Sequence, residues 1–123
     1  MKTVTFTIEP FTESLNRFKE AFKAVRAGRH IEPQETVGFT SLEAARNFLT
    51  RERLALLHAI KRRQPKSIYE LAKMTGRDLK NIQEDVRILE RHGLVRIAKR
   101  PRGRRTVKAP RVPFDEIALK IAI

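Results

Sequence analysis

The chain has 123 residues, about one domain, and with 41% hydrophobic and 33% charged residues its composition is that of a folded protein. Its 27 Lys and Arg against 14 Asp and Glu give a net charge of +13, which favours polyanionic partners, nucleic acid first. The absence of cysteine excludes disulfides, thiolate metal sites and cysteine nucleophiles, and suits a reducing cytoplasm. No segment approaches the roughly 18 apolar residues of a membrane span, and we expect neither such a span nor a signal peptide but a cytoplasmic protein.

Residues 1–39 are predicted to form a strand followed by a helix. Apolar residues alternate with threonines from Thr3 to Ile8, which is the pattern of a half-buried strand, and Pro10 ends it. An amphipathic helix is expected next, ending near Gly28. Its apolar stripe, at spacings of four, three, four and three, consists of Phe11, Leu15, Phe18, Phe22 and Val25. Residues 29–38 show no clear period, and we expect a connector there with one short strand.

Residues 40–93 are divided into helices by capping residues and helix breakers. The expected N-caps are Thr40, Thr50, Ser67 and Asp78. Two of them open capping boxes with Glu43 and Glu70, in which hydroxyl and carboxylate satisfy free amides of the first turn. The expected breakers are Pro65, Gly76 and Gly93.

The remaining residues, 94–123, show strand patterns around a basic segment. The run from Arg100 to Arg104 contains Pro101 and Gly103 between two strand-like stretches, which predicts a hairpin with a tight basic tip. Alternation from Ile117 to Ile123 predicts a terminal strand. The first and last strands have similar lengths, so they can pair either within one chain or between chains.

The order of helix, short helix, turn, helix and basic hairpin is the layout of a winged helix-turn-helix. The stretch from Ile68-Tyr69-Glu70-Leu71-Ala72 to Leu89-Glu90-Arg91-His92-Gly93-Leu94-Val95 resembles the core of MarR-like and ArsR-like transcriptional regulators. Recognition helices of those regulators commonly end in Leu-Glu-x-x-Gly-Leu-Val. The resemblance covers about residues 50–109 and implies a DNA-binding regulator. The whole chain is more loosely similar to small prokaryotic DNA-binding regulators, some of which accompany toxins as antitoxins.

We therefore expect an α+β, mainly helical fold in three parts. Residues 40–112 are predicted to form the winged helix-turn-helix domain with a basic β-hairpin wing. The strand-helix segment 1–39 precedes it and is a dimerisation or partner-binding element, and 113–123 form the short terminal strand.

The recognition helix of this domain is predicted to present a polar face to DNA. At about 100° per residue, an apolar stripe at Leu79, Ile82, Val86 and Leu89 faces the other helices. In the major groove Asn and Gln pair with adenine, and Arg and Lys with guanine. The base-reading candidates are therefore Lys80, Asn81, Gln83 and Arg87. Glu84 is expected to orient Lys80 or Arg87, with acceptance from a cytosine amino group as the alternative. For the whole face, the alternative is simple solvation.

The wing carries many cations and no acid. Such a density of like charge destabilises a fold unless an anion neutralises it, so we expect these side chains on the DNA backbone or in the minor groove. The candidates are Lys99, Arg100, Arg102, Arg104, Arg105 and Lys108, followed by Arg111. A disordered basic loop is the alternative. Flanking phosphate candidates are Arg62, Arg63, Lys66, Arg77 and Arg91, some of which also complement a helix dipole.

The apolar stripe of the first helix needs a cover, because a single helix cannot bury it. It packs either on its own winged domain or at a two-fold interface, and we expect a homodimer. An alternative function follows from the same stripe: an antitoxin that represses its own operon and grips a toxin through its N-terminal half.

Catalysis and cofactor binding are not expected. The three histidines, His30, His58 and His92, do not have the spacing of metal ligands. The serines Ser14, Ser41 and Ser67 lack a nucleophile elbow, and the chain has no glycine-rich phosphate loop. An RNA-binding or ribosome-associated protein is the second alternative. RNA recognition favours exposed aromatic side chains, and neither the wing nor the recognition helix contains one.

Overall fold

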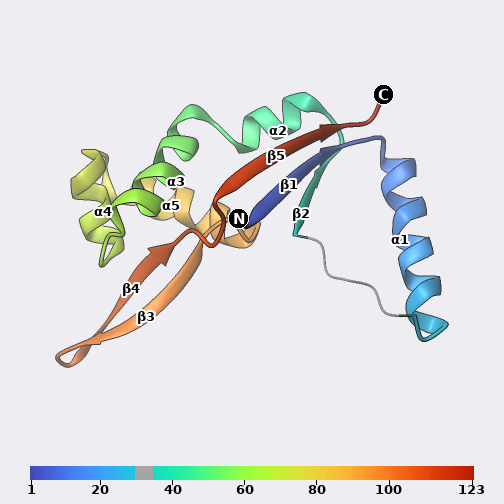
Figure 1. Cartoon of the computed structure of the whole chain (residues 1–123). Helices are drawn as coiled ribbons and strands as arrows, with labels where there is room; N and C mark the ends of the chain where they lie inside the picture. The colour runs from blue at the N-terminus through green and yellow to red at the C-terminus, as the bar shows by residue number, and fades with distance from the viewer. Residues whose placement is uncertain (30–34) are drawn as a thin grey trace. The chain divides into compact units, whose positions relative to one another are not determined.

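The protein has an α+β fold, and its computed structural model describes residues 1–29 and 35–123 (Figure 1). The predicted residues His30 and 31–34 of the connector lie outside this description, as do the side chains of Phe11 and Ser14. The described elements group into two compact units. The first contains Thr3–Phe48 and Glu116–Ile123, and the second contains Leu49–Asp115 together with Lys2.

The first unit is built on a three-stranded parallel sheet. Strand β1 (Thr3–Ile8) lies between β2 (Thr36–Phe39) and β5 (Glu116–Ile121), and both neighbours run parallel to it (Figure 1). The first and last strands therefore pair within one chain, in a register that runs from Thr3 opposite Glu116 to Ile8 opposite Ile121.

One face of this sheet is apolar and covered. Val4, Phe6 and Ile8 of β1 are buried, as the alternation predicts. Helix α2 (Leu42–Phe48) packs on this face, where the Phe6 ring centroid lies 5.3 Å from Phe39 and 5.9 Å from Phe48. Phe6, Phe39 and Phe48 thus form part of an ordinary core.

The next two helices along the chain differ in how well their N-caps agree with the sequence prediction. Helix α2 begins after Ser41, whose Oγ accepts from the Ala44 N–H at 3.1 Å, so the predicted capping box at Thr40 was wrong by one residue. Only Thr40 and Ser41 separate β2 from α2. Thr40 connects the strand to the N-cap residue Ser41. In helix α3 (Arg51–Arg63) the Thr50 hydroxyl accepts from the Arg53 N–H at 3.2 Å, which confirms that cap.

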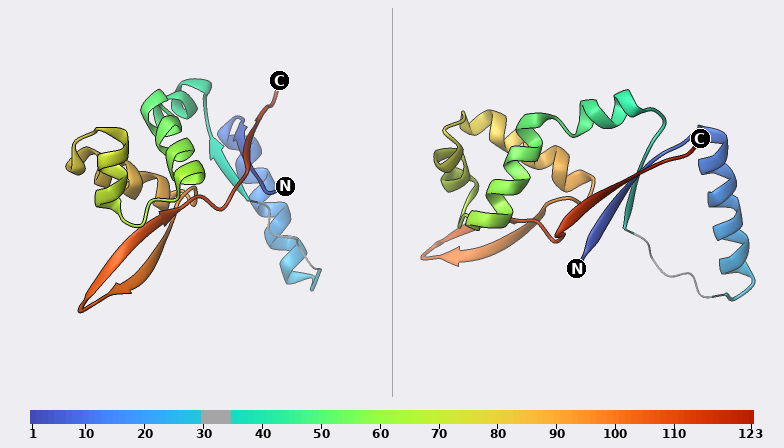
Figure 2. Two further views of the ribbon diagram at one scale, coloured as in Figure 1. Left: turned by 60° about the vertical axis from the view of Figure 1, so that its left-hand side comes forward. Right: turned by 45° about the horizontal axis from the view of Figure 1, so that its top comes forward.

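The second unit contains three helices and a two-stranded ribbon. Helix α3 is followed by α4 (Ile68–Thr75) and α5 (Leu79–Arg91), and then by β3 (Arg96–Arg102) paired antiparallel with β4 (Arg105–Arg111). Both views in Figure 2 show this ribbon, Arg96–Arg111, extending away from the helices of its unit. Its core contains large apolar side chains from all three helices: Leu56, Ile60, Leu71, Ile82 and Leu89.

The ends of α4 and α5 follow the predicted breakers. Ser67 caps α4 by accepting from the Glu70 N–H at 2.9 Å, and Gly76 ends it in the left-handed conformation with φ 66°. Asp78 occupies the N-cap position of α5, as predicted, although its side chain accepts no capping hydrogen bond. Gly93, with φ 79°, follows the end of α5.

The two units divide the chain differently from the predicted segments 1–39, 40–112 and 113–123. Helix α2 belongs with the sheet, and β5 completes that sheet instead of standing apart. Within the described ranges no helix has both the length and the apolar character needed to cross a membrane.

Candidate nucleic-acid interface

Helix α5 separates its apolar and polar residues onto two faces. Ile82, Val86 and Leu89 are buried and anchor the helix in the core of its unit, as the spacing predicts. The base-reading candidates are all exposed: Lys80, Asn81, Gln83 and Arg87. The helix therefore presents amide and cationic side chains along one solvent-facing surface.

An ion-pair network holds α5 against α3. One oxygen of the Asp85 carboxylate, on α5, accepts from Arg53 Nε of α3 at 3.1 Å, and the other accepts from Arg77 Nη2 at 2.8 Å. All three side chains are largely buried, which strengthens their attraction relative to a surface pair. The structure thus engages Arg77, a predicted phosphate contact, in positioning α5.

The ribbon places like charges directly opposite each other. Of its seven cross-strand pairs, three join two cations: Arg96 with Arg111, Lys99 with Lys108, and Arg102 with Arg105. Gly103, with φ 64°, is the first of the two turn residues and Arg104 the second. The predicted tip is shorter than expected, since residues 100–102 continue β3 and only 103–104 form the turn.

Shallow grooves bring the ribbon and helix candidates together within this unit. Gln83, Arg87 and Glu90 of α5 line one groove with Lys99 and Lys108 of the ribbon. A second groove is lined by residues of α4, α5 and the ribbon, among them Tyr69, Gln83, Arg102, Arg105 and Lys108. A third combines Lys66 with Arg100 and Arg102. Most wing candidates thus adjoin a base-reading candidate or a flanking cation.

Tyr69 is a residue of this surface that the sequence analysis did not select. Its side chain is exposed, and Lys73 Nζ lies 4.9 Å from the centroid of its ring. The sequence signal was available: Tyr69 and Lys73 stand four residues apart, off the buried stripe that contains Leu71 and Ala72.

The other predicted cations fall into two groups. Arg62, Arg91 and Arg104 are exposed. Arg63 Nη1 donates to the Met74 carbonyl at 3.3 Å, and Arg111 Nη1 donates to the carbonyls of Pro65 and Pro110 at 2.8 and 2.7 Å. Arg63 and Arg111 therefore stabilise the fold of the second unit by bonding backbone carbonyls.

Lys61, at the basic end of α3, is also engaged within its unit. Its Nζ lies 3.2 Å from Asp115 Oδ1. The backbone N–H of Lys2, which donates to Asp115, and the Lys61 ammonium together hold the pKa of this carboxyl below its ordinary value. Lys61 therefore pairs with a carboxylate of its own unit, and its Nζ also donates to the Val112 carbonyl at 3.3 Å.

No group of three His, Asp or Glu side chains that could hold a metal ion is found in residues 1–29 and 35–123. A family model described as HVO_A0114 matches residues 48–119, which is more than half of the chain and includes the whole of α3 to β4. Neither a curated protein nor a solved structure matches the chain.

Proposed function

Because the chain belongs to the HVO_A0114 family through residues 48–119, we propose a function for the surface of that segment: it binds double-stranded DNA. In this proposal α3, α4, α5 and the ribbon act as a winged helix-turn-helix, as in MarR-like and ArsR-like regulators. Binding at a chosen sequence would make the protein a regulator of transcription.

The cation pairs of the ribbon carry the proposal. Like charges directly opposite on neighbouring strands destabilise a sheet, and here three such pairs recur along one ribbon. Phosphates between or beside the paired cations remove this repulsion and release counterions from the DNA. A ribbon with this charge pattern is suited to a polyanion with closely spaced charges.

The exposed face of α5 is the second feature that supports DNA binding. An α-helix fits the major groove of B-form DNA, and the amides of Asn81 and Gln83 suit the adenine edge there. Asp85, held by Arg53 and Arg77, fixes the rotation of this helix about its own axis. The proposal thus assigns sequence reading to α5 and backbone contacts to the ribbon.

Tyr69 favours a second candidate, an RNA-binding protein. Exposed aromatic rings beside cations stack on unpaired bases, and Tyr69 shares a groove with Arg102 and Arg105. A single such ring is a weaker feature than the three cation pairs, and DNA remains the first proposal.

A comparison of matched DNA and RNA duplexes tests the function. We expect tighter binding to DNA at about 150 mM salt, because the A-form major groove is too narrow for α5. Charge alone would favour the more densely charged RNA helix. Fluorescence anisotropy with both duplexes and a single-stranded control measures this. If the RNA duplex or single-stranded RNA binds as tightly as the DNA duplex or more tightly, the second candidate is favoured.

We also propose that the protein acts as a homodimer through helix α1 (Phe11–Arg26). Phe18, Phe22 and Val25 are 67%, 55% and 62% exposed, so the described residues leave this stripe largely uncovered. From Leu15 to Val25 the spacing is three, four, three, which is the same in both directions along the helix. An antiparallel pair of α1 helices therefore places Leu15 opposite Val25, and Phe18 opposite Phe22, as a two-fold interface requires.

Light scattering tests the dimer. The wild-type protein is expected at about twice its chain mass of 14.3 kDa, and Phe18→Ser with Phe22→Ser is expected at one chain mass. Both side chains are exposed in the single chain, so the free energy of unfolding of the monomer changes little. Glu20→Gln, on the opposite side of α1, is the control. A wild-type protein that stays monomeric at all concentrations would contradict the dimer. The apolar stripe of α1 would then be expected to bind another protein, as in the antitoxin alternative.

A further inference from the structure

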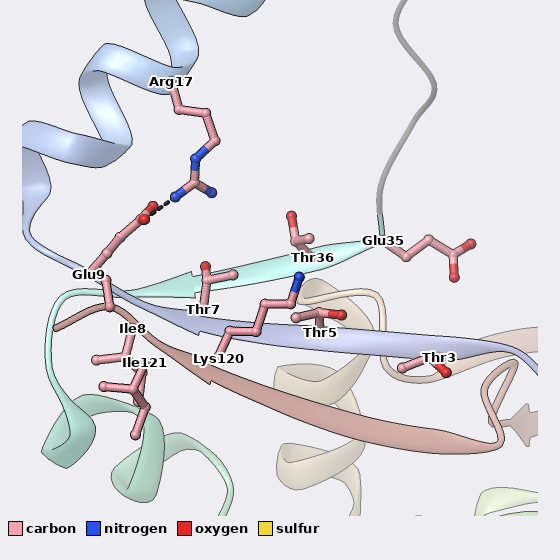
Figure 3. Close-up of a pocket in the computed structure, with 11 residues that line it drawn as sticks. Thr3, Thr5, Thr7, Ile8, Glu9, Arg17, Glu35, Thr36, Lys120 and Ile121 are labelled. Atoms are coloured by element: carbon pink, nitrogen blue, oxygen red, sulfur yellow. Dashed lines mark hydrogen bonds and ion pairs between the residues drawn. The ribbon is translucent and has the colours of Figure 1, made fainter.

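The second face of the β2–β1–β5 sheet is polar. Thr3, Thr5 and Thr7 of β1 point away from the apolar core, and Thr36 of β2 and Lys120 of β5 lie on the same side (Figure 3). Parallel sheets usually have both faces covered. A helix with an apolar stripe cannot cover a row of hydroxyls without leaving them unsatisfied, so a polar occupant suits this face.

A cavity is present on this face, lined by residues of all three strands, among them Thr5, Thr7, Thr36 and Lys120. Its volume is about 830 Å³. This is within the range of about 300–1,000 Å³ typical of small-molecule sites.

Among residues 1–29 and 35–123, the charges around the cavity leave the Lys120 ammonium without a carboxylate partner. Glu9 is buried and its carboxylate is paired with Arg17, which reaches from α1 toward the sheet (Figure 3). Glu116 accepts from Thr3 Oγ1 at 2.6 Å, and Glu35 lies at the rim with its carboxylate directed away from the threonines. Lys120 extends across the threonine row, and among the described residues no carboxylate pairs with it.

We propose that this cavity binds a small organic anion, distinct from the nucleic acid of the second unit. A carboxylate of the ligand pairs with the Lys120 ammonium, and the hydroxyls of Thr5, Thr7 and Thr36 bond its other polar groups. Because Arg17 also lines the cavity, the bound anion contacts α1 as well as the sheet. The site is therefore a ligand-binding site of the first unit.

Nitrogen-15 NMR titration with acetate, citrate and inorganic phosphate, as sodium salts at constant ionic strength, tests this. At least one of the two carboxylates, citrate first, is expected to shift the amides of Thr5, Thr7 and Lys120 in a saturable way. Lys120→Gln should weaken this binding by about tenfold or more. Thr5→Val, which keeps the shape and strand preference of the residue, should weaken it by a smaller factor.

Lys108→Gln in the ribbon is the matched control, since it removes one cation from the second unit and should leave the titration unchanged. Saturable shifts confined to the ribbon, saturation with phosphate alone or with none of the three anions, or equal affinity in Lys120→Gln would each overturn the proposal. The duplex-binding experiment is independent of this one, because Lys120 lies outside the ribbon and helices α3–α5.

Discussion

Replacing Arg102 and Arg105 by alanine is expected to weaken binding to every DNA duplex by about thirtyfold at roughly 0.15 M salt. Each phosphate contact adds about 0.9 to the slope of log affinity against log salt, which is about fivefold at this salt concentration. The double variant should therefore lose about 1.8 units of slope. Anisotropy titrations over a range of salt concentrations, on specific and random duplexes, measure both quantities.

A second readout separates this effect from unfolding. Arg102 and Arg105 are opposite each other in the ribbon, so their removal relieves repulsion and should leave the free energy of unfolding unchanged or slightly increased. Lys19→Ala with Lys23→Ala on α1 is the control, with the same change in net charge in the first unit. An equal loss of affinity in this control would mean that net charge alone drives binding.

Replacing Asn81 or Gln83 by alanine is expected to act on one sequence only. Loss of a bidentate contact to a base costs about 1–3 kcal/mol, which is roughly 5- to 150-fold in affinity for the preferred site. Random DNA should lose less than about threefold, because these neutral amides release no counterions. Selection from a random duplex library identifies the site, and competition titrations then compare it with random DNA.

Asn16→Ala on α1 is the matched control, since it removes an exposed amide from the other unit. Equal losses on the preferred site and on random DNA for Asn81→Ala and Gln83→Ala would contradict a sequence-reading role for α5. The ribbon would then account for all binding, and the protein would be a general polyanion binder.

Features that depend on neighbouring residues could be predicted from the sequence. The buried stripe of α5 follows from helical periodicity, the caps at Thr50 and Ser67 from hydroxyls beside free amides, and the end of α4 from a glycine that tolerates positive φ. The alternation in β1 likewise predicted its buried face. The base-reading candidates follow from the same periodicity, because exposure along a helix is periodic, whereas the wing candidates follow from their density of like charge.

Only the tertiary structure decided which distant segments meet. Thr3 and Glu116 are 113 residues apart, and no local pattern specifies that their strands pair in parallel within one chain. The cation pairs of the ribbon depend on its register, since a shift by one residue would bring different side chains opposite each other. The bonds from Arg53 and Arg77 to Asp85 also join residues of separate elements. Sequence periodicity determines which way a side chain points, whereas its partner depends on how distant segments bury their apolar faces together.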